Sequence, residues 1–331
     1  MKLDKVNYKI LSNLDFNARI PVTLLAKKVN ISKQNLNYRL KKLIENKVIL
    51  GFISVINVHS LSYLTYRLYL RYKSIKKEEE QKIIDYFKKH ENVLWFVSTT
   101  GSYDLELIFV ARNYIHFSNI LKKIREDQGN FFSKYNISMS IANYHFKRDY
   151  LLNEKRSLFT KKYYGFEPSK ENIDSLDIKI LTELSRNCRQ NSQEIGRKLN
   201  ITYHTVKDRI KKLEDKNIIQ YHRILIDIDK INRKYYKALI KLNANKNQEE
   251  DIYNFCCHYN FIVYLVEVLG DWQLDIEAEV ESQDQFNNFL REFRNKFSDL
   301  ITDYEILQVT KEHKLNYFPV EKDITENYQS Y

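Results

Sequence analysis

Apolar residues recur every three or four positions through the first 46 residues, in three runs separated by short polar breaks. This spacing places the apolar side chains of each run on one face of a helix, so it predicts three short helices. The apolar positions are Val6, Ile10, Leu11 and Leu14 in the first run, Leu24, Leu25 and Val29 in the second, and Leu36, Leu40 and Leu43 in the third. Three such helices in this order are typical of a helix-turn-helix domain.

The residues between the runs are suited to helix ends. Asp4 and Ser32 can cap the first and third helices, because their side-chain oxygens accept hydrogen bonds from the free N–H groups of a first turn. Pro21 suits the start of the second helix, and Asn30 can end that helix in a left-handed conformation. The third helix, from Ser32 to about Asn46, is therefore the expected recognition helix.

The pattern changes from helical to alternating after residue 47. Residues 48–58, VILGFISVINV, are rich in β-branched residues and predict the strand pair, or wing, of a winged helix. From about Tyr63 the order strand–helix–strand–strand–helix–strand follows, which is the ferredoxin-like βαββαβ unit. Its predicted elements are strand 66–72, helix 78–89, strand 93–99, turn 101–104, strand 105–111, helix 114–125 and strand 135–146.

The whole arrangement occurs twice. Residues 25–49, LAKKVNISKQNLNYRLKKLIENKVI, correspond without a gap to residues 195–219, IGRKLNITYHTVKDRIKKLEDKNII. In the second alternating region Gly101 corresponds to Gly270. A repeat of this length indicates two complete copies of a two-domain unit rather than a solenoid.

We therefore predict an α+β chain in which a winged helix-turn-helix domain plus a ferredoxin-like domain is repeated in tandem. The expected boundaries are 1–60 and 61–152 for the first copy, 153–169 for a charged linker, 170–232 and 233–320 for the second copy, and 321–331 for a loose polar tail.

Composition narrows the classes of function. The chain has 43% hydrophobic residues but six glycines among 331 residues, and it contains no glycine-rich phosphate-binding motif. The three cysteines form no C-x-x-C pair, and Cys256, Cys257 and His258 are consecutive on a predicted helix, so they cannot converge on one metal ion. No signal peptide or membrane-spanning run is visible, and we expect a cytoplasmic protein without a cofactor.

Net charge is unevenly distributed along the chain. The formal charge of +11 divides into +16 for residues 1–165 and −5 for residues 166–331. The two helix-turn-helix regions carry +8 (residues 1–60) and +2 (residues 166–232). Because a basic surface attracts polyanions, the sequence predicts that the first copy binds double-stranded DNA more strongly than the second.

The polar face of each third helix carries side chains that can reach base edges or phosphates. A solvated helix face is the alternative, and the preceding turn motif favours DNA contact. The candidates in the first copy are Ser32, Lys33, Gln34, Asn35, Asn37 and Tyr38, with Arg39, Lys41 and Lys42 as phosphate contacts or salt-bridge partners. The candidates in the second copy are Thr202, Tyr203, His204, Thr205, Lys207, Arg209, Lys211 and Lys212. Asp208 beside them would repel phosphate if it faced the DNA backbone.

Three features together resemble the Lrp/AsnC, or feast/famine, family of transcription regulators. They are the start LDKVNYKILSNLDFNAR, the motif at 25–49, and Gly101-Ser102-Tyr103-Asp104 between the middle strands of the βαββαβ domain, with a second copy of each. The resemblance implies ferredoxin-like (RAM, or AsnC-type) domains that pair through their sheets and bind small effectors, often amino acids, where they meet. It therefore implies a pseudo-dimer within one chain, which can assemble further into homo-oligomers.

By the same resemblance, the glycine turns are the candidate effector corners. The residues concerned are Thr99, Thr100, Gly101, Tyr103 and Asp104 in the first copy, and Gly270 and Trp272 in the second. A structural turn is the alternative interpretation. Gln273 stands where the first copy has Asp104, so if Asp104 binds an amino group, the second corner has lost that charge. The two corners then bind different effectors, or only one of them binds.

Two other classes of protein remain as alternatives. Sirohaem decarboxylases resemble the same two-domain unit, but their typical Asn-Leu-Trp-Phe strand is matched by neither residues 104–108 nor residues 273–276 here. A sensing or assembly module that has lost DNA binding is the third class. The absence of a recognisable catalytic motif favours a regulator that is not an enzyme.

Overall fold

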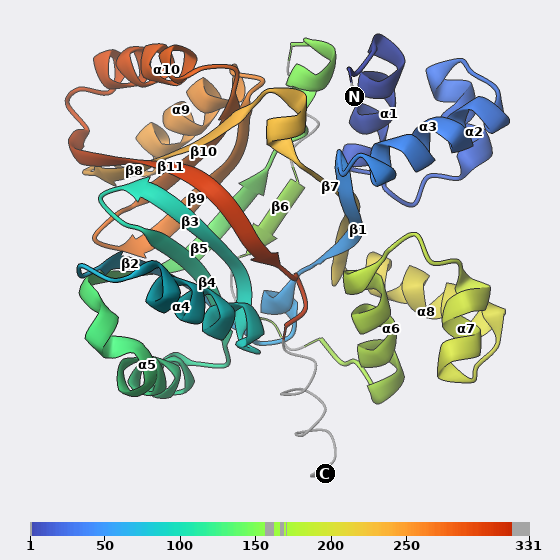
Figure 1. Cartoon of the computed structure of the whole chain (residues 1–331), viewed down its shortest axis with the longest axis horizontal. Coiled ribbons are helices and arrows are strands. Elements are labelled where there is room, and N and C mark those ends of the chain that lie inside the picture. The colour runs from blue at the N-terminus through green and yellow to red at the C-terminus, as the bar shows by residue number, and fades with distance from the viewer. Residues whose placement is uncertain (1, 156–161, 166–168, 170, 320–331) are drawn as a thin grey trace.

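The computed structural model describes residues 2–155, 162–165, 169 and 171–319, and it contains the tandem α+β arrangement (Figure 1). The first helix-turn-helix comprises α1 (Lys5–Asp15), α2 (Val22–Val29) and α3 (Lys33–Glu45), followed by β1 (Ile49–Ile56). The second comprises α6 (Ser175–Arg186), α7 (Ser192–Leu199) and α8 (Tyr203–Asp215), followed by β7 (Ile219–Ile226).

The ferredoxin-like domains have the predicted βαββαβ order. The first contains β2 (Leu64–Tyr72), α4 (Lys77–Lys89), β3 (Val93–Gly101), β4 (Leu105–Ala111), α5 (Tyr114–Gln128) and β5 (Phe132–His145). The second contains β8 (Lys234–Leu242), α9 (Lys246–Cys257), β9 (Ile262–Gly270), β10 (Leu274–Val280), α10 (Gln283–Lys296) and β11 (Ile301–Leu315).

The helix ends confirm the predicted caps. The side chains of Asp4 and Ser32 accept hydrogen bonds from the first-turn N–H groups of Asn7 and Asn35. Asn30 ends α2 in the left-handed region with φ 57°. Its second-copy equivalent Asn200 has φ 56°, so local side-chain chemistry determines the same turn twice.

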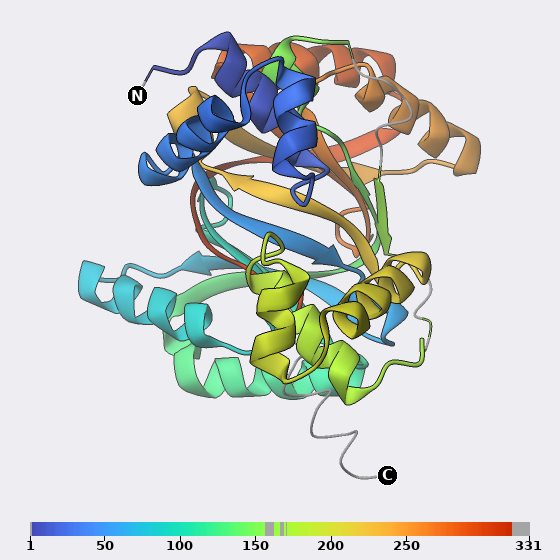
Figure 2. The ribbon, with the colours of Figure 1, turned by 90° about the vertical axis from the view of Figure 1, so that its right-hand side faces the viewer.

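The predicted wings differ from the structure. Residues 48–58 contain one strand, β1, rather than a strand pair, and β1 pairs in antiparallel fashion with β7 of the other helix-turn-helix. The β-branched run satisfies its backbone hydrogen bonds with the second copy instead of with a local hairpin. The two helix-turn-helix domains are therefore joined by a shared two-stranded ribbon, which lies between them in Figure 2.

The ferredoxin-like domains share a closed sheet. Its strand order in the described part of the chain is β2-β4-β3-β11-β8-β10-β9-β5-β6, and a further pairing of β2 with β5 closes the ring. The last strand of each domain pairs with its own first strand and with the second strand of the other domain, as β5 does with β2 and β9 and β11 does with β8 and β3. Among the described strands, the closed ring leaves no free main-chain edge between the two copies.

The helices cover the outside of this ring. In Figure 1, α9 and α10 lie against one side, and α4 and α5 lie against the other. Alternate residues of each strand face these helices, for example Leu68 and Leu107, which belong to the apolar core beneath α4 and α5. The remaining alternate residues face the interior, where the two halves of the sheet oppose each other.

That interior contains a buried cluster of charges. Arg67 of β2 and Lys237 of β8 occupy equivalent positions in the two copies, and both contact Glu106, Asp275 and Glu277. All five side chains are buried. Because three carboxylates face two cations, one proton would neutralise the cluster, and burial raises the pKa of Asp275 to about 7.

The segment predicted as a linker is partly a strand. Residues 162–165 form β6 (Lys162–Gly165), which pairs with β5. The segment is preceded by a 3-10 turn at Asp149–Leu152. The predicted loose tail at 321–331 lies outside the described residues.

The two glycine turns permit close contacts between the copies. Gly101 has φ 128°, and a Cβ atom built on it would lie 2.4 Å from the main-chain oxygen of Ile306 on β11. Gly270 has φ 155°, and its Cβ would lie 2.8 Å from the main-chain oxygen of Ile137 on β5. Glycine is therefore required by the junction between the sheets at each corner.

We expect Gly101→Ala to lower the free energy of unfolding by about 2–4 kcal/mol, because the methyl group meets main chain and the residue has a positive φ. Gly129→Ala is the matched control, since its Cβ would approach no closer than 3.7 Å and its φ is −58°. Urea unfolding followed by circular dichroism measures both variants. Equal losses in the two variants would show that the junction does not depend on this glycine.

Candidate nucleic-acid interface

The predicted base-reading residues of α3 are on the protein surface. Lys33, Gln34, Asn35, Asn37 and Tyr38 are all exposed, and the Tyr38 side chain has 63% of its surface accessible. Leu36, Leu40 and Leu43 on the opposite face are buried. This burial fixes α3 in the domain and leaves its polar face open.

Arg39 is held by α1 rather than left open for phosphate. Its guanidinium donates to Asp4, at 2.7 Å, and to the side-chain oxygens of Asn7 and Asn35. The N–H of Asn7 and then the Arg39 guanidinium lower the pKa of Asp4. Of the two roles that the sequence left open for Arg39, the geometry supports the salt-bridge partner.

The same contact is repeated in the second copy. Arg209 pairs with Asp174, and its Nη1 lies 3.1 Å from Asp177. Each arginine therefore joins its recognition helix to the first helix of the same domain. A partly exposed ion pair stabilises the folded state by only a modest amount. The main role of these two pairs is therefore to fix the angle between the recognition helix and the first helix.

The remaining candidates of the two copies differ in their ion pairs and in their exposure. Lys42 pairs with Glu45 at 3.0 Å, and Lys41 lies 3.8 Å from the same carboxylate. In α8 the candidates Thr202, Tyr203, His204, Lys207, Lys211 and Lys212 are exposed, whereas Thr205 is half-buried. The Thr202 side chain caps α8 by accepting from the N–H of Thr205, so it has the same structural role as Ser32.

The two helix-turn-helix domains hold each other through reciprocal contacts that the sequence reasoning missed. Arg19 donates to the main-chain oxygens of Cys188 and Gln190 in the other copy, at 2.6 and 3.2 Å. Its equivalent Arg189 donates to the main-chain oxygen of Ala18 at 2.8 Å. The signal in the sequence was the arginine shared by both copies just after the first helix.

Main-chain hydrogen bonds add to these reciprocal contacts of Arg19 and Arg189, and we call the whole set the lock between the two domains. The N–H of Ala18 donates to His222 on β7, and the N–H of Cys188 donates to Phe52 on β1. Each domain is thus bonded to the ribbon strand of the other. The lock and the ribbon together fix the relative placement of α3 and α8, and Figure 2 shows the two domains on the same side of the molecule.

A second buried network connects the helix-turn-helix pair to the closed sheet. Asp15 at the end of α1 pairs with Arg148, at 2.8 Å, and with Arg223 of β7, at 3.2 Å. Arg148 also pairs with Glu279 of β10 through two hydrogen bonds of 2.7 and 2.8 Å. All four side chains are buried, so movement of one helix-turn-helix would disturb ion pairs in the other domains.

The candidate effector corners lie where the two copies meet. Thr99, Tyr103 and Trp272 are buried, whereas Thr100, Gly101 and Gly270 are exposed. The Thr99 hydroxyl donates to the main-chain oxygen of Tyr103 at 2.8 Å. These contacts are those of a structural turn packed against a neighbouring strand.

The Asp104 side chain has a structural partner at this corner. Its carboxylate accepts from the N–H of Tyr72 at 2.8 Å, and in the second copy the Gln273 side chain accepts from the N–H of Leu242 at 2.9 Å. The acid and the amide therefore make the same contact at equivalent positions. Whether the two corners differ in effector stays a prediction.

The other chemistry considered from the sequence has a structural explanation. Cys188, Cys256 and Cys257 are buried and form no disulfide within the described residues, and His258 is exposed. Within the described residues, no group of three or more histidine, cysteine or acidic side chains is arranged to hold a metal ion. No helix of that part of the chain is both long and apolar enough to cross a bilayer.

Comparisons with known proteins match the two halves separately. A family model described as winged helix-turn-helix DNA-binding matches residues 3–49 and 173–220. The HTH-type transcriptional regulator LrpB of Bacillus subtilis is 32% identical over 145 residues, which are 44% of this chain and 93% of that protein. The HTH-type transcriptional regulator Ptr1 of Methanocaldococcus jannaschii is 29% identical over 120 residues, 36% of this chain and 80% of that protein.

A solved structure matches the full length. The siroheme decarboxylase NirDL covers 99% of both chains with a TM-score of 0.63 and 11% sequence identity. At this identity the likeness shows a shared tandem fold and nothing about the reaction. The two sequence relatives, by contrast, are named as regulators, and each is matched over 80% or more of its length by less than half of this chain. The chain therefore belongs to the Lrp/AsnC family of helix-turn-helix transcriptional regulators, as two fused units.

Proposed function

We propose that this protein regulates transcription by binding an asymmetric DNA site with both recognition helices. The observation that carries the proposal is the lock between the two helix-turn-helix domains, because it fixes α3 and α8 on the same side of the molecule. Two helices held in this way suit half-sites about one helical turn, ~34 Å, apart on DNA.

The two half-sites would contribute unequally. The first helix-turn-helix region carries +8 and presents Gln34 and Asn37, which suit adenine edges. The second region carries +2 and places Asp208 on the exposed part of α8. Because phosphate contacts supply much of the affinity, the first domain would provide most of the binding and the second would add selectivity.

A small effector at the glycine corners, such as an amino acid, remains part of the proposal. It is supported by the position of these corners at the junction of the two copies, where Gly101 and Gly270 approach the opposite strand. A ligand that changed this junction would alter the closed sheet that carries both helix-turn-helix domains. Further assembly of whole chains into homo-oligomers is a prediction of the same kind.

The alternative function is that of an enzyme of the sirohaem decarboxylase type. The shared fold with NirDL raises this alternative, and the strands at 104–108 and 273–276 lack its typical motif. Purified protein with absorption in the Soret region would support a bound tetrapyrrole and count against a role confined to DNA binding.

We expect the double variant Gln34→Ala/Asn37→Ala to bind its selected DNA site at least tenfold more weakly, because each lost base contact costs about 1–3 kcal/mol. The matched control is His204→Ala/Lys207→Ala, which changes the equivalent positions of α8. Its loss should be smaller. Fluorescence anisotropy with labelled duplexes measures both variants, and losses of equal size would contradict the unequal division between the two domains.

A second prediction separates positioning from phosphate contact. Arg39→Ala should lower the free energy of unfolding by about 1 kcal/mol, because it removes the contacts with Asp4, Asn7 and Asn35. The slope of log affinity against log salt should stay unchanged, whereas Lys33→Ala should reduce that slope by about one unit. A reduced slope for Arg39→Ala would show that this guanidinium contacts phosphate after all.

A further inference from the structure

A cavity of about 530 Å³ lies between the helix-turn-helix ribbon and the closed sheet. Both copies contribute to its walls: residues 224–229 at the end of β7 form one side, and residues of β3, β5, β9 and β11 form the other. Exposed residues such as Leu50, Ile141 and Lys311 are among its lining, so it reaches the surface. Its volume is in the range of small-molecule sites. The glycine corners, Gly101 and Gly270, are not part of it.

The buried cations in this cavity are already neutralised. Arg67 pairs with three carboxylates of the central cluster. Arg148 pairs with Asp15 and Glu279. Arg223 pairs with Asp15 and also donates to the Tyr264 hydroxyl. An anionic ligand would have to compete with these ion pairs, and breaking a buried pair is strongly unfavourable.

Glu312 of β11 differs from these groups. One carboxylate oxygen accepts from the indole N–H of Trp95 at 2.8 Å, and no salt bridge reaches Glu312 from any cation in the described part of the chain. The residue keeps solvent-accessible surface, and it lines the cavity. Burial raises the pKa of this carboxyl group, so its charge lacks full compensation.

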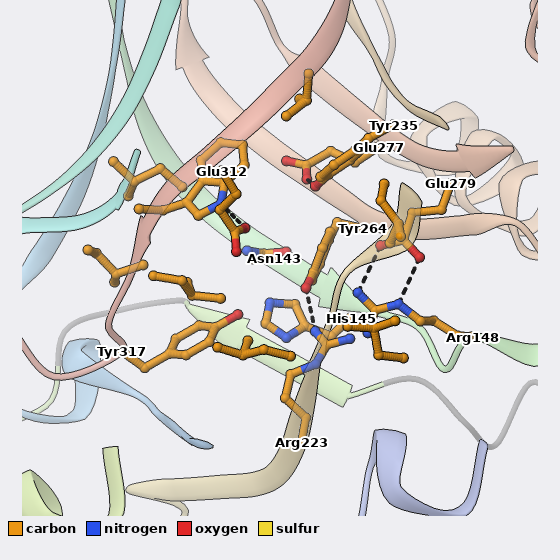
Figure 3. Close-up of a pocket in the computed structure, with 18 of the residues that line it drawn as sticks. Asn143, His145, Arg148, Arg223, Tyr235, Tyr264, Glu277, Glu279, Glu312 and Tyr317 are labelled. Carbon is orange, nitrogen blue, oxygen red and sulfur yellow. Dashed lines mark hydrogen bonds and ion pairs between the residues drawn. The ribbon is translucent and has the colours of Figure 1, made fainter. Parts of the chain in front are cut away.

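The acid at position 312 has no acidic equivalent in the other copy. The repeat places Asn143 of β5 where the other side has Glu312, and Tyr264 where it has Trp95. In Figure 3 the side chains of Glu312, Tyr264 and Tyr317 point toward a common space beside Asn143. The asymmetry makes this a feature of the fused chain, because two identical subunits would place the same residue on both sides.

Another part of the wall is apolar or aromatic. Leu94, Ile108 and Ile224 line the cavity together with Trp95 and Tyr317. Aliphatic and aromatic walls favour an apolar body, and aromatic faces also attract organic cations. A ligand that combines a positive group for Glu312 with an apolar body would satisfy both parts of the wall.

We propose that this cavity binds a small organic amine, with its ammonium group on Glu312 and its apolar body against the Trp95, Ile224 and Tyr317 walls. The site is separate from the effector corners and does not depend on DNA binding. Since β7 and the Arg148–Arg223 network border the cavity, an amine bound there would contact the ribbon that joins the two helix-turn-helix domains.

The test uses 2-phenylethylamine, which is protonated at neutral pH, as the probe with the full-length chain. Isothermal titration should show saturable binding of one amine per chain, and tryptophan fluorescence should change because Trp95 donates to Glu312. The anion 3-phenylpropionate and the neutral 3-phenylpropan-1-ol have similar bodies without the positive charge. Each should bind at least tenfold more weakly than the amine.

Two matched variants test whether the Glu312 carboxylate binds the amine. Glu312→Gln keeps the shape and the acceptor for Trp95, and it should weaken amine binding at least tenfold. Asp303→Asn removes an exposed acid from the same strand outside the cavity and should leave binding unchanged. The proposal is overturned if the amine shows no saturable binding, if the anion binds as tightly as the amine, or if Glu312→Gln binds the amine like the unmodified chain. The comparison of the three probes needs no variant, so it decides the matter even if Glu312→Gln fails to fold.

Discussion

The structure depends on reciprocal strand pairing between the two copies. The last strand of each ferredoxin-like domain hydrogen-bonds to the second strand of the other, β5 to β9 and β11 to β3. These pairings bring Arg67 and Lys237 together with Glu106, Asp275 and Glu277 at the centre of the closed sheet. Neither copy could bury these charges alone, because each cation shares carboxylates from both copies.

The same reciprocity extends to the helix-turn-helix domains. The β1–β7 ribbon and the Arg19 and Arg189 contacts hold them as one unit. Joining the two copies in one chain allows equivalent positions to diverge while the pairing is kept. The first helix-turn-helix region is strongly basic and the second is nearly neutral, and the equivalent positions 312 and 143, which both line the interior cavity, hold a glutamate and an asparagine. Such differences are unavailable to a dimer of identical subunits.

Sequence patterns predicted what depends on local chemistry. The caps at Asp4 and Ser32, the left-handed Asn30 and the βαββαβ order all follow from neighbouring residues. Contacts between residues that lie far apart along the chain could not be predicted from neighbouring residues. A β-branched run looks the same whether it forms a hairpin or pairs with β7. Acids at alternate positions of β10 look like a solvent-facing side, although Asp275, Glu277 and Glu279 are buried against cations from distant strands.

The roles of individual site residues were the hardest to predict, because they depend on contacts that cross between elements. Arg39 could contact phosphate or an acid, and only the position of Asp4 beside it favours the second role. The central claim is that one rigid chain reads two unequal half-sites, and the most direct test is selection from random duplex DNA at low salt followed by sequencing. The account predicts an asymmetric site with one well-defined half and one weakly defined half about a helical turn away. A symmetric palindrome with equally strong halves, or no enriched sequence, would contradict it.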